Sequence, residues 1–390
     1  MRLPLPFLLL FAACSSNEPT GGEPIPAFVS IHASAGYACG LAADGIAWCW
    51  GNPMTVLGNG LAGSNLIYTP EPALNGVRFA SLSFGSIHAC GIGLDDVAYC
   101  WGQSGEGAVG TGHPANTTEP TPAPIEPPGA FTQVAAGLLH SCGLTAGGAA
   151  YCWGSNDIGE LGDGTGTNRL RPTPVAGGHT FATVATGLGP GDLNDQNSCA
   201  LTAEGAAWCW GANGSGALGD GSTSANSFSP VAVSGGLSFA SLDVTGGLVC
   251  GITTGSDLYC WGRGDRAPAL VPGGLKWSRI SVSTDHLCGV TTDARIYCWG
   301  ENRSGQLGIG PGTDVFIGEP TPIAGPAGLT WRDVSAGVGQ TCAIASDDTS
   351  WCWGFGEGGE LGIGVLPAHT PPYLAFSPVR IARTRAANSP

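Results

Sequence analysis

The stretch His140–Gly154, HSCGLTAGGAAYCWG, places two cysteines ten residues apart around a glycine pair. Short apolar runs flank Gly147 and Gly148, which is typical of a β-hairpin with its turn midway between the cysteines. Such a turn sets Cys142 opposite Cys152 on adjacent strands, close enough for a disulfide. Zinc knuckles and thioredoxin-like motifs require closer cysteine spacings. We therefore expect a structural disulfide.

The same spacing recurs seven times along the chain, and a Trp-Gly dipeptide follows the second cysteine of every copy. The pairs are Cys39 with Cys49, Cys90 with Cys100, Cys142 with Cys152, Cys199 with Cys209, Cys250 with Cys260, Cys288 with Cys298, and Cys342 with Cys352. They use fourteen of the fifteen cysteines and leave Cys14 unpaired. Paired cysteines at this density indicate an oxidising compartment.

The composition is rich in turn-forming residues and poor in charge. The 390 residues include 66 Gly and 29 Pro, only 11% are charged, and the net charge is −15. Frequent glycine and proline between short apolar runs indicate an all-β fold with many turns. A strongly acidic surface repels nucleic acid, so we expect no nucleic-acid partner.

The N-terminus predicts export. Arg2 precedes an apolar stretch, residues 3–13, that is too short to span a membrane and reads as a signal peptide, residues 1–13. Phe11–Cys14 resembles a bacterial lipobox, so we expect a lipidated Cys14, a polar tether over residues 14–26 and a membrane-anchored or secreted protein. The alternative is an ordinary cleaved signal with an incidental cysteine.

Each repeat contains four short strand-forming segments. A proline-led segment such as PTPVAG from Pro172 precedes an aromatic-led segment such as FTQVAAG from Phe131, and the cysteine-paired hairpin supplies the other two. Four short strands repeated seven times predict an all-β, seven-bladed β-propeller of four-stranded blades over residues 27–383, with a tail at 384–390.

The order of the segments suggests how the ring closes. The first repeat begins at its aromatic-led segment from Phe28, whereas one additional proline-led segment from Pro378 follows the last hairpin. We expect residues 378–382 to pair beside residues 28–35, so that the C-terminal strand joins the first blade. Closure removes exposed sheet edges.

The tryptophans that follow the hairpin cysteines predict how blades pack. Neighbouring side chains on a strand point to opposite faces, so Trp50 faces away from Cys49, and the other copies repeat this pattern. We expect tryptophans on one face of each blade and disulfides on the other to fill the wedge between blades.

Four copies continue with a recurring phrase after Trp-Gly. Two of them read GSNDIGELGDG from Gly154 and GENRSGQLGIG from Gly300. With AGLLHSCGL from Ala136, this phrase resembles the regulator of chromosome condensation repeat, and the resemblance covers about residues 27–382. The fifth copy departs from it with a truncated GRGDRAPA from Gly262.

The functions of that family diverge, because fold alone does not fix function. Its founding member is a nuclear exchange factor for a small GTPase, so the resemblance implies an exchange-factor-like regulator as one alternative. The predicted export and the cysteine pairs favour another: a non-enzymatic, monomeric extracytoplasmic scaffold that presents rim loops to a protein or polysaccharide. A hydrolase has no motif to support it, and we expect no catalytic residue, cofactor or metal.

Three histidines lie two residues before the first cysteine of their hairpins: His88, His140 and His286. They belong to different repeats, and Tyr37, Asn197 and Gln340 hold the same position elsewhere. We therefore expect each side chain to bond local backbone rather than to form a metal or catalytic site.

Departures from the repeat supply the candidate binding loops. The segment from Gly187 to Cys199 is about seven residues longer than its counterpart and carries Asp192 and Asp195. The short fifth copy predicts a notch in the rim near residues 263–268, with Arg263 and Asp265 as candidates. The alternative is that these loops vary in sequence without having a function. The Arg-Gly-Asp match to an integrin-binding tripeptide is so short that it can arise by chance.

Overall fold

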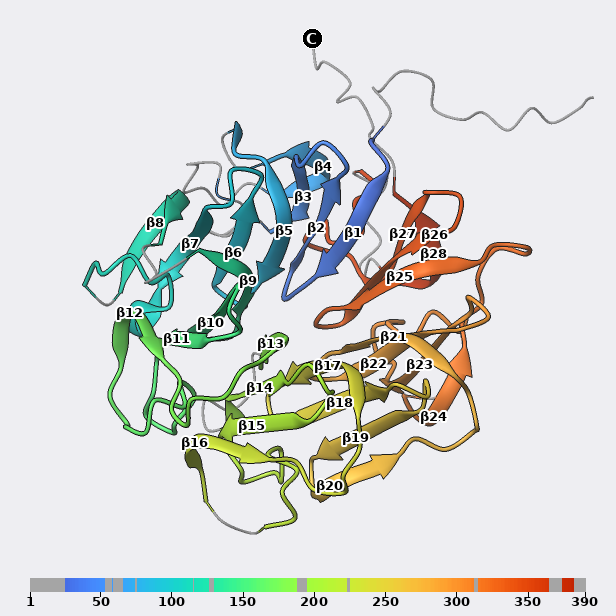
Figure 1. The fold of residues 1–390 in the computed structure, drawn as a ribbon. Coiled ribbons are helices and arrows are strands. Elements are labelled where there is room, and N and C mark those ends of the chain that lie inside the picture. Colours follow the sequence, from blue (N-terminus) through green and yellow to red (C-terminus); the bar gives the residue numbers. More distant parts are fainter. Residues whose placement is uncertain are drawn as a thin grey trace, which may run out of the picture.

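A computed structural model describes residues 25–52, 58, 66–73, 76–114, 116–125, 130–187, 195–222, 225–311, 315–364 and 374–381. They form a ring of seven four-stranded antiparallel sheets (Figure 1). Within each sheet the four strands follow one another in chain order from the centre of the ring to its rim. The fold is the predicted seven-bladed β-propeller, and among the described residues no helix is long and apolar enough to cross a membrane.

The inner strands carry the aromatic-led segments and surround the central axis. They are β1 (Phe28–Ala33), β5 (Phe79–Phe84), β9 (Phe131–Ala136), β13 (Thr183–Thr186), β17 (Phe239–Thr245), β21 (Trp277–Val282) and β25 (Trp331–Ala336). The second strands are β2 (Tyr37–Ala42), β6 (His88–Gly93), β10 (His140–Thr145), β14 (Asn197–Leu201), β18 (Leu248–Thr253), β22 (His286–Thr291) and β26 (Gln340–Ala345).

The third strands end in Trp-Gly and the outer strands carry the proline-led segments. The third strands are β3 (Ala47–Gly51), β7 (Ala98–Ser104), β11 (Ala150–Gly154), β15 (Ala207–Gly211), β19 (Leu258–Gly262), β23 (Ile296–Glu301) and β27 (Ser350–Phe355). The outer strands are β4 (Ile67–Pro72), β8 (Thr117–Pro124), β12 (Arg169–Pro174), β16 (Ser227–Ala232), β20 (Asp265–Leu270), β24 (Phe316–Pro322) and β28 (Leu374–Arg380). A short 3-10 turn, Gly105–Gly107, follows β7.

Every hairpin disulfide forms as the spacing predicts. Cys142 lies directly opposite Cys152 in the register of β10 and β11, and their Cα atoms are 4.1 Å apart. The other six disulfides have the same Cα separation and join Cys39 to Cys49, Cys90 to Cys100, Cys199 to Cys209, Cys250 to Cys260, Cys288 to Cys298, and Cys342 to Cys352. In each of these pairs the two cysteines also lie directly opposite one another in the strand register. Each disulfide therefore fastens the middle two strands of one blade.

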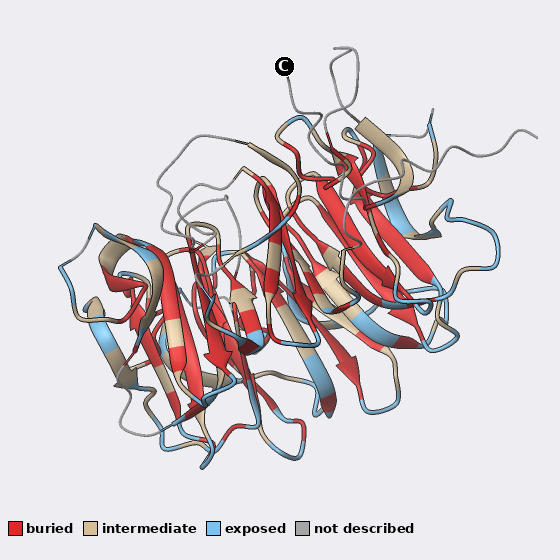
Figure 2. Cartoon of the chain, turned by 90° about the horizontal axis from the view of Figure 1, so that it is seen from above, coloured by how far each residue is buried: buried red, intermediate tan, exposed pale blue. Residues whose placement is uncertain are grey.

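The blades pack with tryptophan against disulfide, as expected. In the core between blades 1 and 2, Cys39 and Cys49 lie against Phe79 and Trp101 of the next blade. Figure 2 shows that buried residues run along the strands of the blades, whereas exposed residues gather at the loops. Glycine after the cysteine makes room for the inner aromatic residue, since a Cβ on Gly40 would lie 2.4 Å from the ring of Phe28.

The ring closes differently from our expectation. The C-terminal strand β28 pairs with β27 and completes blade 7, with Cys352 opposite Val379. The inner strand β1 pairs with β2 and, within the described part of the C-terminal segment, does not pair with residues 378–381. Each blade is thus four consecutive strands, and β1 meets blade 7 by packing beside β25 and β26. The repeating pattern has no marked start, so it left open which strand begins a blade.

Side chains of the inner strands add polar links between blades. The hydroxyl of Ser335 in β25 accepts a hydrogen bond of 2.9 Å from the backbone N–H of Ala33 in β1. Ser281 accepts one of 3.0 Å from Ala336 in the same way. Both amides lie in edge strands, β1 and β25, that pair with a strand of their own blade on one side only, so the serines supply an acceptor that a further strand would otherwise provide.

Candidate functional site

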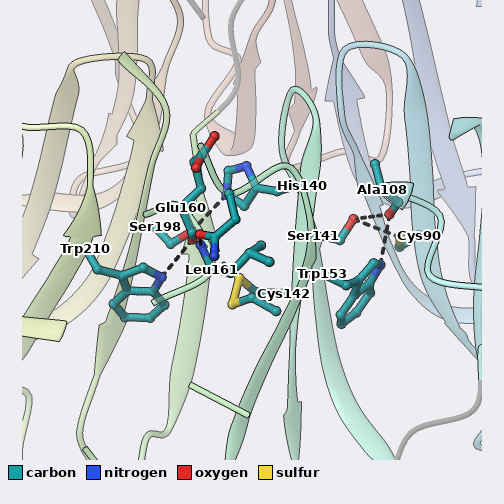
Figure 3. The surroundings of a disulfide bond; sticks show 12 residues. Cys90, Ala108, His140, Ser141, Cys142, Trp153, Glu160, Leu161, Ser198 and Trp210 are labelled. Atoms are coloured by element: carbon teal, nitrogen blue, oxygen red, sulfur yellow. Dashed lines mark hydrogen bonds between the residues drawn. A yellow bond between two sulfur atoms is a disulfide. The ribbon is translucent and has the colours of Figure 1, made fainter. Parts of the chain in front are cut away.

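In five blades, the described loop between the third and outer strands covers the tryptophan of the next blade, and we call it the sealing loop. The backbone carbonyl of Ala108, in the loop after β7, accepts hydrogen bonds of 2.9 Å from Trp153 Nε1 and from Ser141 Oγ of blade 3 (Figure 3). Further indole bonds of this kind are Trp210 to Glu160 (2.8 Å), Trp261 to Ala217 (3.0 Å), Trp353 to Gln306 (2.9 Å) and Trp50 to Glu360 (2.8 Å). The loops thereby fix neighbouring blades relative to one another.

The three histidines bond the neighbouring blade rather than the local backbone that we expected. His88 Nε2 lies 2.7 Å from Ser141 Oγ, and His140 Nε2 lies 2.9 Å from Ser198 Oγ. In blade 6, His286 Nε2 lies 2.7 Å from the hydroxyl of Thr341. Each hydroxyl also donates to the sealing loop carbonyl, so the histidine completes the junction.

Burial keeps two of these histidines uncharged. It lowers the pKa of His88 to about 3 and the pKa of His140 to about 4. Their Nδ1 atoms are buried without a hydrogen-bond partner. Among the residues that the structure describes, no group of three or more His, Cys, Asp or Glu side chains is placed to hold a metal ion.

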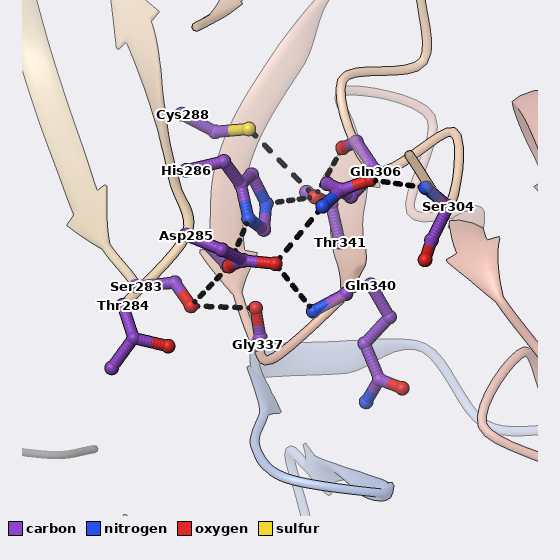
Figure 4. Close-up of polar contacts among 12 residues, drawn as sticks. Ser283, Thr284, Asp285, His286, Cys288, Ser304, Gln306, Gly337, Gln340 and Thr341 are labelled. Carbon is purple, nitrogen blue, oxygen red and sulfur yellow. Dashed lines mark hydrogen bonds and ion pairs between the residues drawn. The ribbon is translucent and has the colours of Figure 1, made fainter. Parts of the chain in front are cut away.

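A polar cluster lies at one face of the junction between blades 6 and 7 (Figure 4). Asp285 accepts hydrogen bonds from Ser283 Oγ (2.9 Å), Gln306 Nε2 (2.9 Å) and the backbone N–H of Gly339 (3.0 Å), and pairs with His286 Nδ1 at 2.9 Å. Burial alone would raise the pKa of Asp285, but these hydrogen bonds outweigh it and lower the pKa to about 2. Asp285 is therefore a fixed anion at neutral pH.

Two of the predicted loop residues come together near this anion. Arg263 forms the turn after β19, and its guanidinium donates to the carbonyl of Thr284. Partial burial lowers the pKa of Arg263, while the charges of Asp285 and Asp195 act in the opposite direction. The backbone carbonyl of Asp195 also accepts the N–H of Gly247 beside this turn, at 3.0 Å.

The other two candidates are not part of this group. Asp265 begins the outer strand β20 and is exposed to solvent. Asp192 lies outside the described residues, as do Cys14 and the N-terminal segment that we expect to direct export.

The centre of the ring holds a cavity of about 600 Å³ lined by all seven inner strands. Its charged groups include Arg279, whose Nε lies 3.2 Å from Asp333 Oδ1, and Asp243, which accepts the N–H of Val282 at 2.8 Å. His32 also lines it, and burial together with the charge of Arg279 lowers the pKa of His32 to about 4. Sequence reasoning missed this cavity, since its lining comes from seven distant segments.

Family profiles identify the repeats. Two profiles, both described as the regulator of chromosome condensation (RCC1) repeat, match residues 95–144 and 293–344, and residues 131–159, 192–217 and 277–306. These matches fall on blades of the seven-bladed ring. The chain belongs to the RCC1-repeat family.

Curated relatives share the repeat at modest identity. The ultraviolet-B receptor UVR8 of Arabidopsis thaliana is 27% identical over 345 residues, which cover 86% of this chain and 67% of the receptor. The human E3 ubiquitin-protein ligase HERC2 is 28% identical over 301 residues. That match covers 76% of this chain but only 5% of HERC2, so this RCC1-repeat chain spans a small part of the ligase's length.

Solved structures have the same fold. Prp20p from Saccharomyces cerevisiae matches with a TM-score of 0.73 at 21% identity, covering 88% of this chain and 87% of that one. Human WBSCR16 matches with a TM-score of 0.71 at 20% identity, covering 83% and 88% of the two chains. At these identities the likeness shows the RCC1 propeller fold alone.

The fifth RCC1 repeat lacks its sealing loop. Strands β19 and β20 are joined by the two-residue turn Arg263-Gly264, with Gly262 opposite Asp265. Trp299 of blade 6 is consequently 8% exposed, whereas Trp153 and its sealed counterparts in other blades are fully buried. The truncated sequence predicted a notch at this rim. That the notch exposes Trp299 could be recognised only from the packing of blade 5 against blade 6.

Proposed function

We propose that this RCC1-repeat chain is a non-enzymatic, extracytoplasmic scaffold that presents loops at the rim of its propeller to a protein partner. The observation that carries the proposal is the combination of seven disulfide-fastened blades with loop-sealed junctions. Such a ring is a rigid support, and irregular loops on a rigid support are where binding residues tend to lie. A polysaccharide is the second class of ligand to test.

The disulfides support a location outside the cytoplasm. Thirteen of the fourteen paired cysteines have no exposed surface, and Cys260 is half-buried. Reducing compartments rarely contain proteins with this many disulfides. The signal peptide, the lipidation of Cys14 and the membrane anchor remain part of the proposal.

A protein partner is favoured over nucleic acid. The net charge of −15 opposes binding to phosphate backbones. Among proteins of the same fold, Prp20p binds Gsp1p and histones, and yeast RCC1 has been solved bound to Kap60. We infer a comparable use of the propeller surface here, with the loop of Asp192 and Asp195 and the turn at Arg263 as the binding region.

Non-reducing peptide mapping of the protein from its native membrane fraction tests the location. Seven intact disulfides together with an acylated Cys14 are expected. Free thiols and an intact Met1 would place the protein in the cytosol. They would also make accelerated nucleotide release from a small GTPase the activity to measure.

Deletion of residues 189–194 tests the binding region. We expect the full chain to recover a specific protein from an exported fraction, and the deletion variant to lose it while keeping its unfolding midpoint. A matched control deletes residues 223–224, which lie between β15 and β16 of the same blade in sequence. Unchanged recovery by the first variant would remove this loop from the proposal.

A further inference from the structure

The sealing loops share one hexapeptide, Gly-x-Leu-Gly-x-Gly. It occurs at residues 159–164, 216–221, 305–310 and 359–364, and residues 107–112 contain the variant with valine. In each copy the carbonyl of the second residue accepts the indole N–H of the next blade. The apolar third residue is buried, with Leu161 and Leu307 fully so.

The last glycine of the hexapeptide bonds the outer strand of the next blade. The N–H of Gly164 donates a 2.8 Å hydrogen bond to the carbonyl of Phe228, and Gly310 donates one of 2.8 Å to Phe376. The fourth residue must be glycine, because a Cβ on Gly308 would lie 2.7 Å from Trp353 Nε1. The hexapeptide is therefore recognised through an indole donor, an apolar pocket and a strand carbonyl.

The junction between blades 5 and 6 has the tryptophan and the outer-strand carbonyl of blade 6, but blade 5 supplies no sealing loop to bond them. Trp299 holds the position of the sealed tryptophans, and among the described residues its indole nitrogen has no hydrogen-bond partner. Gly318 of blade 6 corresponds to Phe228 of blade 4. Each is the residue after the one that lies opposite the glycine of Trp-Gly, namely Ile317 opposite Gly300 and Ser227 opposite Gly211. No backbone donor from the described residues of blade 5 reaches Gly318.

Two large apolar side chains are exposed to solvent at the start of the outer strand of blade 6. Phe316 in β24 is 62% exposed and the preceding Val315 is 54% exposed. Cys260 is half-buried, whereas the other thirteen paired cysteines are fully buried. Arg263 gives the rim of the junction a positive charge within an acidic protein.

We propose that the junction between blades 5 and 6 is a docking site for a partner protein that inserts a Gly-x-Leu-Gly-x-Gly turn where the loop of blade 5 is missing. This inference rests on the proposed scaffold function and names the chemistry of the partner. The inserted turn accepts the Trp299 indole N–H, buries its leucine beside the Cys250–Cys260 disulfide and donates to the carbonyl of Gly318. Five copies within the chain provide the geometry.

The probe is a cyclic peptide that contains the sequence of residues 304–310, Ser-Gly-Gln-Leu-Gly-Ile-Gly, added to the full chain labelled with nitrogen-15. We expect the Trp299 indole resonance to shift on addition while the resonances of the sealed tryptophans stay in place. Trp299→Phe should weaken binding about fivefold, through the loss of one hydrogen bond. A peptide with valine in place of the glycine that corresponds to Gly308 should not bind.

A variant in which residues 302–315 replace Arg263 and Gly264 supplies an independent test. The grafted loop is held next to the site, so its effective concentration is high and it should bury Trp299 and abolish peptide binding. If the Trp299 resonance moves neither with the peptide nor in the graft, the docking site does not exist. A Trp299 indole that is already protected in the free chain would indicate occupation by the chain itself or, if protection depends on concentration, by a second copy. Occupation by the chain itself or by a second copy would overturn the partner proposal. The disulfide mapping that tests the scaffold function is independent of all these outcomes.

Discussion

The indole Nε1 of Trp50 donates a 2.8 Å hydrogen bond to the backbone carbonyl of Glu360, which joins the first blade to the last across 310 positions of sequence. Phe28, Trp50, Leu361 and Ile381 form one buried cluster at this seam. Ring closure therefore depends on side-chain packing and single hydrogen bonds rather than on a shared sheet.

Replacing this tryptophan should loosen the seam. Trp50→Phe leaves the Glu360 carbonyl buried without its donor and opens a cavity, so we expect the free energy of unfolding to fall by about 2–4 kcal/mol. Urea denaturation measures the change. Trp299→Phe is the matched control. It should lower the free energy of unfolding clearly less, because the Trp299 indole has no hydrogen bond to lose among the described residues. Equal losses in the two variants would contradict the role of the bond from Trp50 to Glu360.

Truncation distinguishes the observed closure from the closure that we first expected. A chain ending at residue 373 lacks β28, exposes the edge of β27 and removes Ile381 from the seam core, so it should aggregate or unfold at lower temperature. A chain ending at residue 381 retains β28 and should melt close to the full chain. Light scattering during thermal unfolding reports both effects.

The seven disulfides should differ in their reactivity. Thiol attack requires access to sulfur, and Cys260 is half-buried while Cys142 and Cys152 are fully buried. Under limiting reductant in native buffer, we expect the Cys250–Cys260 disulfide to be reduced first. Differential alkylation followed by mass spectrometry measures the order, and uniform reduction of all seven pairs would show that this exposure has no chemical consequence.

The remaining hairpin disulfides provide the matched controls for that experiment. Both sulfurs of each are fully buried, so they should be reduced only when the chain opens. Three of these controls lie in blades 2, 4 and 6 and join Cys90 to Cys100, Cys199 to Cys209, and Cys288 to Cys298.

Acid should weaken the fold through its buried histidines. The pKa of His140 is about 4 in the folded chain, below its ordinary value of 6.5, so between these values the unfolded chain binds more protons. Stability is therefore complete above pH 6.5 and falls as the pH drops toward 4. His88, with a pKa of about 3, acts in the same direction, and each histidine should cost about 2 kcal/mol near pH 5.

The double variant that combines His88→Asn and His140→Asn checks this assignment. Asparagine already occupies the same position in blade 4 as Asn197, so the substitution has a precedent in the chain. Burial raises the pKa of Asp243 to about 6, which by itself favours the folded state at lower pH. Denaturation at pH 7 and pH 5 should show a smaller acid loss in the double variant than in the natural chain. An identical loss would assign the acid sensitivity to other groups.

Much of the fold could be read from one spacing. Ten residues between Cys142 and Cys152, with a glycine turn between them, was enough to place a disulfide-bonded hairpin, and seven copies gave the blades. Alternation along a strand then put Trp50 and Cys49 on opposite faces, as the packing between blades confirms. These features depend on contacts that are local in sequence or repeat with a fixed period.

The features that were wrong or missed depend on where one blade meets another. Residues 378–380 belong to β28 of blade 7. The prediction placed them in the first blade because a periodic pattern does not mark its own starting strand. The histidine partners Ser141 and Ser198 were not foreseen, since each comes from the following blade. Arg263 and Asp195 were selected separately, and only the ring brings both Asp195 and Asp285 close to Arg263.

The uninterrupted order of the strands within every blade has a consequence for the gene. Every blade consists of four consecutive strands. The point between the last strand, β28, and the first strand, β1, is therefore equivalent to any other connection between blades. A permuted gene that began at Phe131 and joined the present ends through a linker would encode the same ring. Duplication or loss of a single repeat would insert or delete one whole blade, which gives such a molecule a simple route to rings of six or eight.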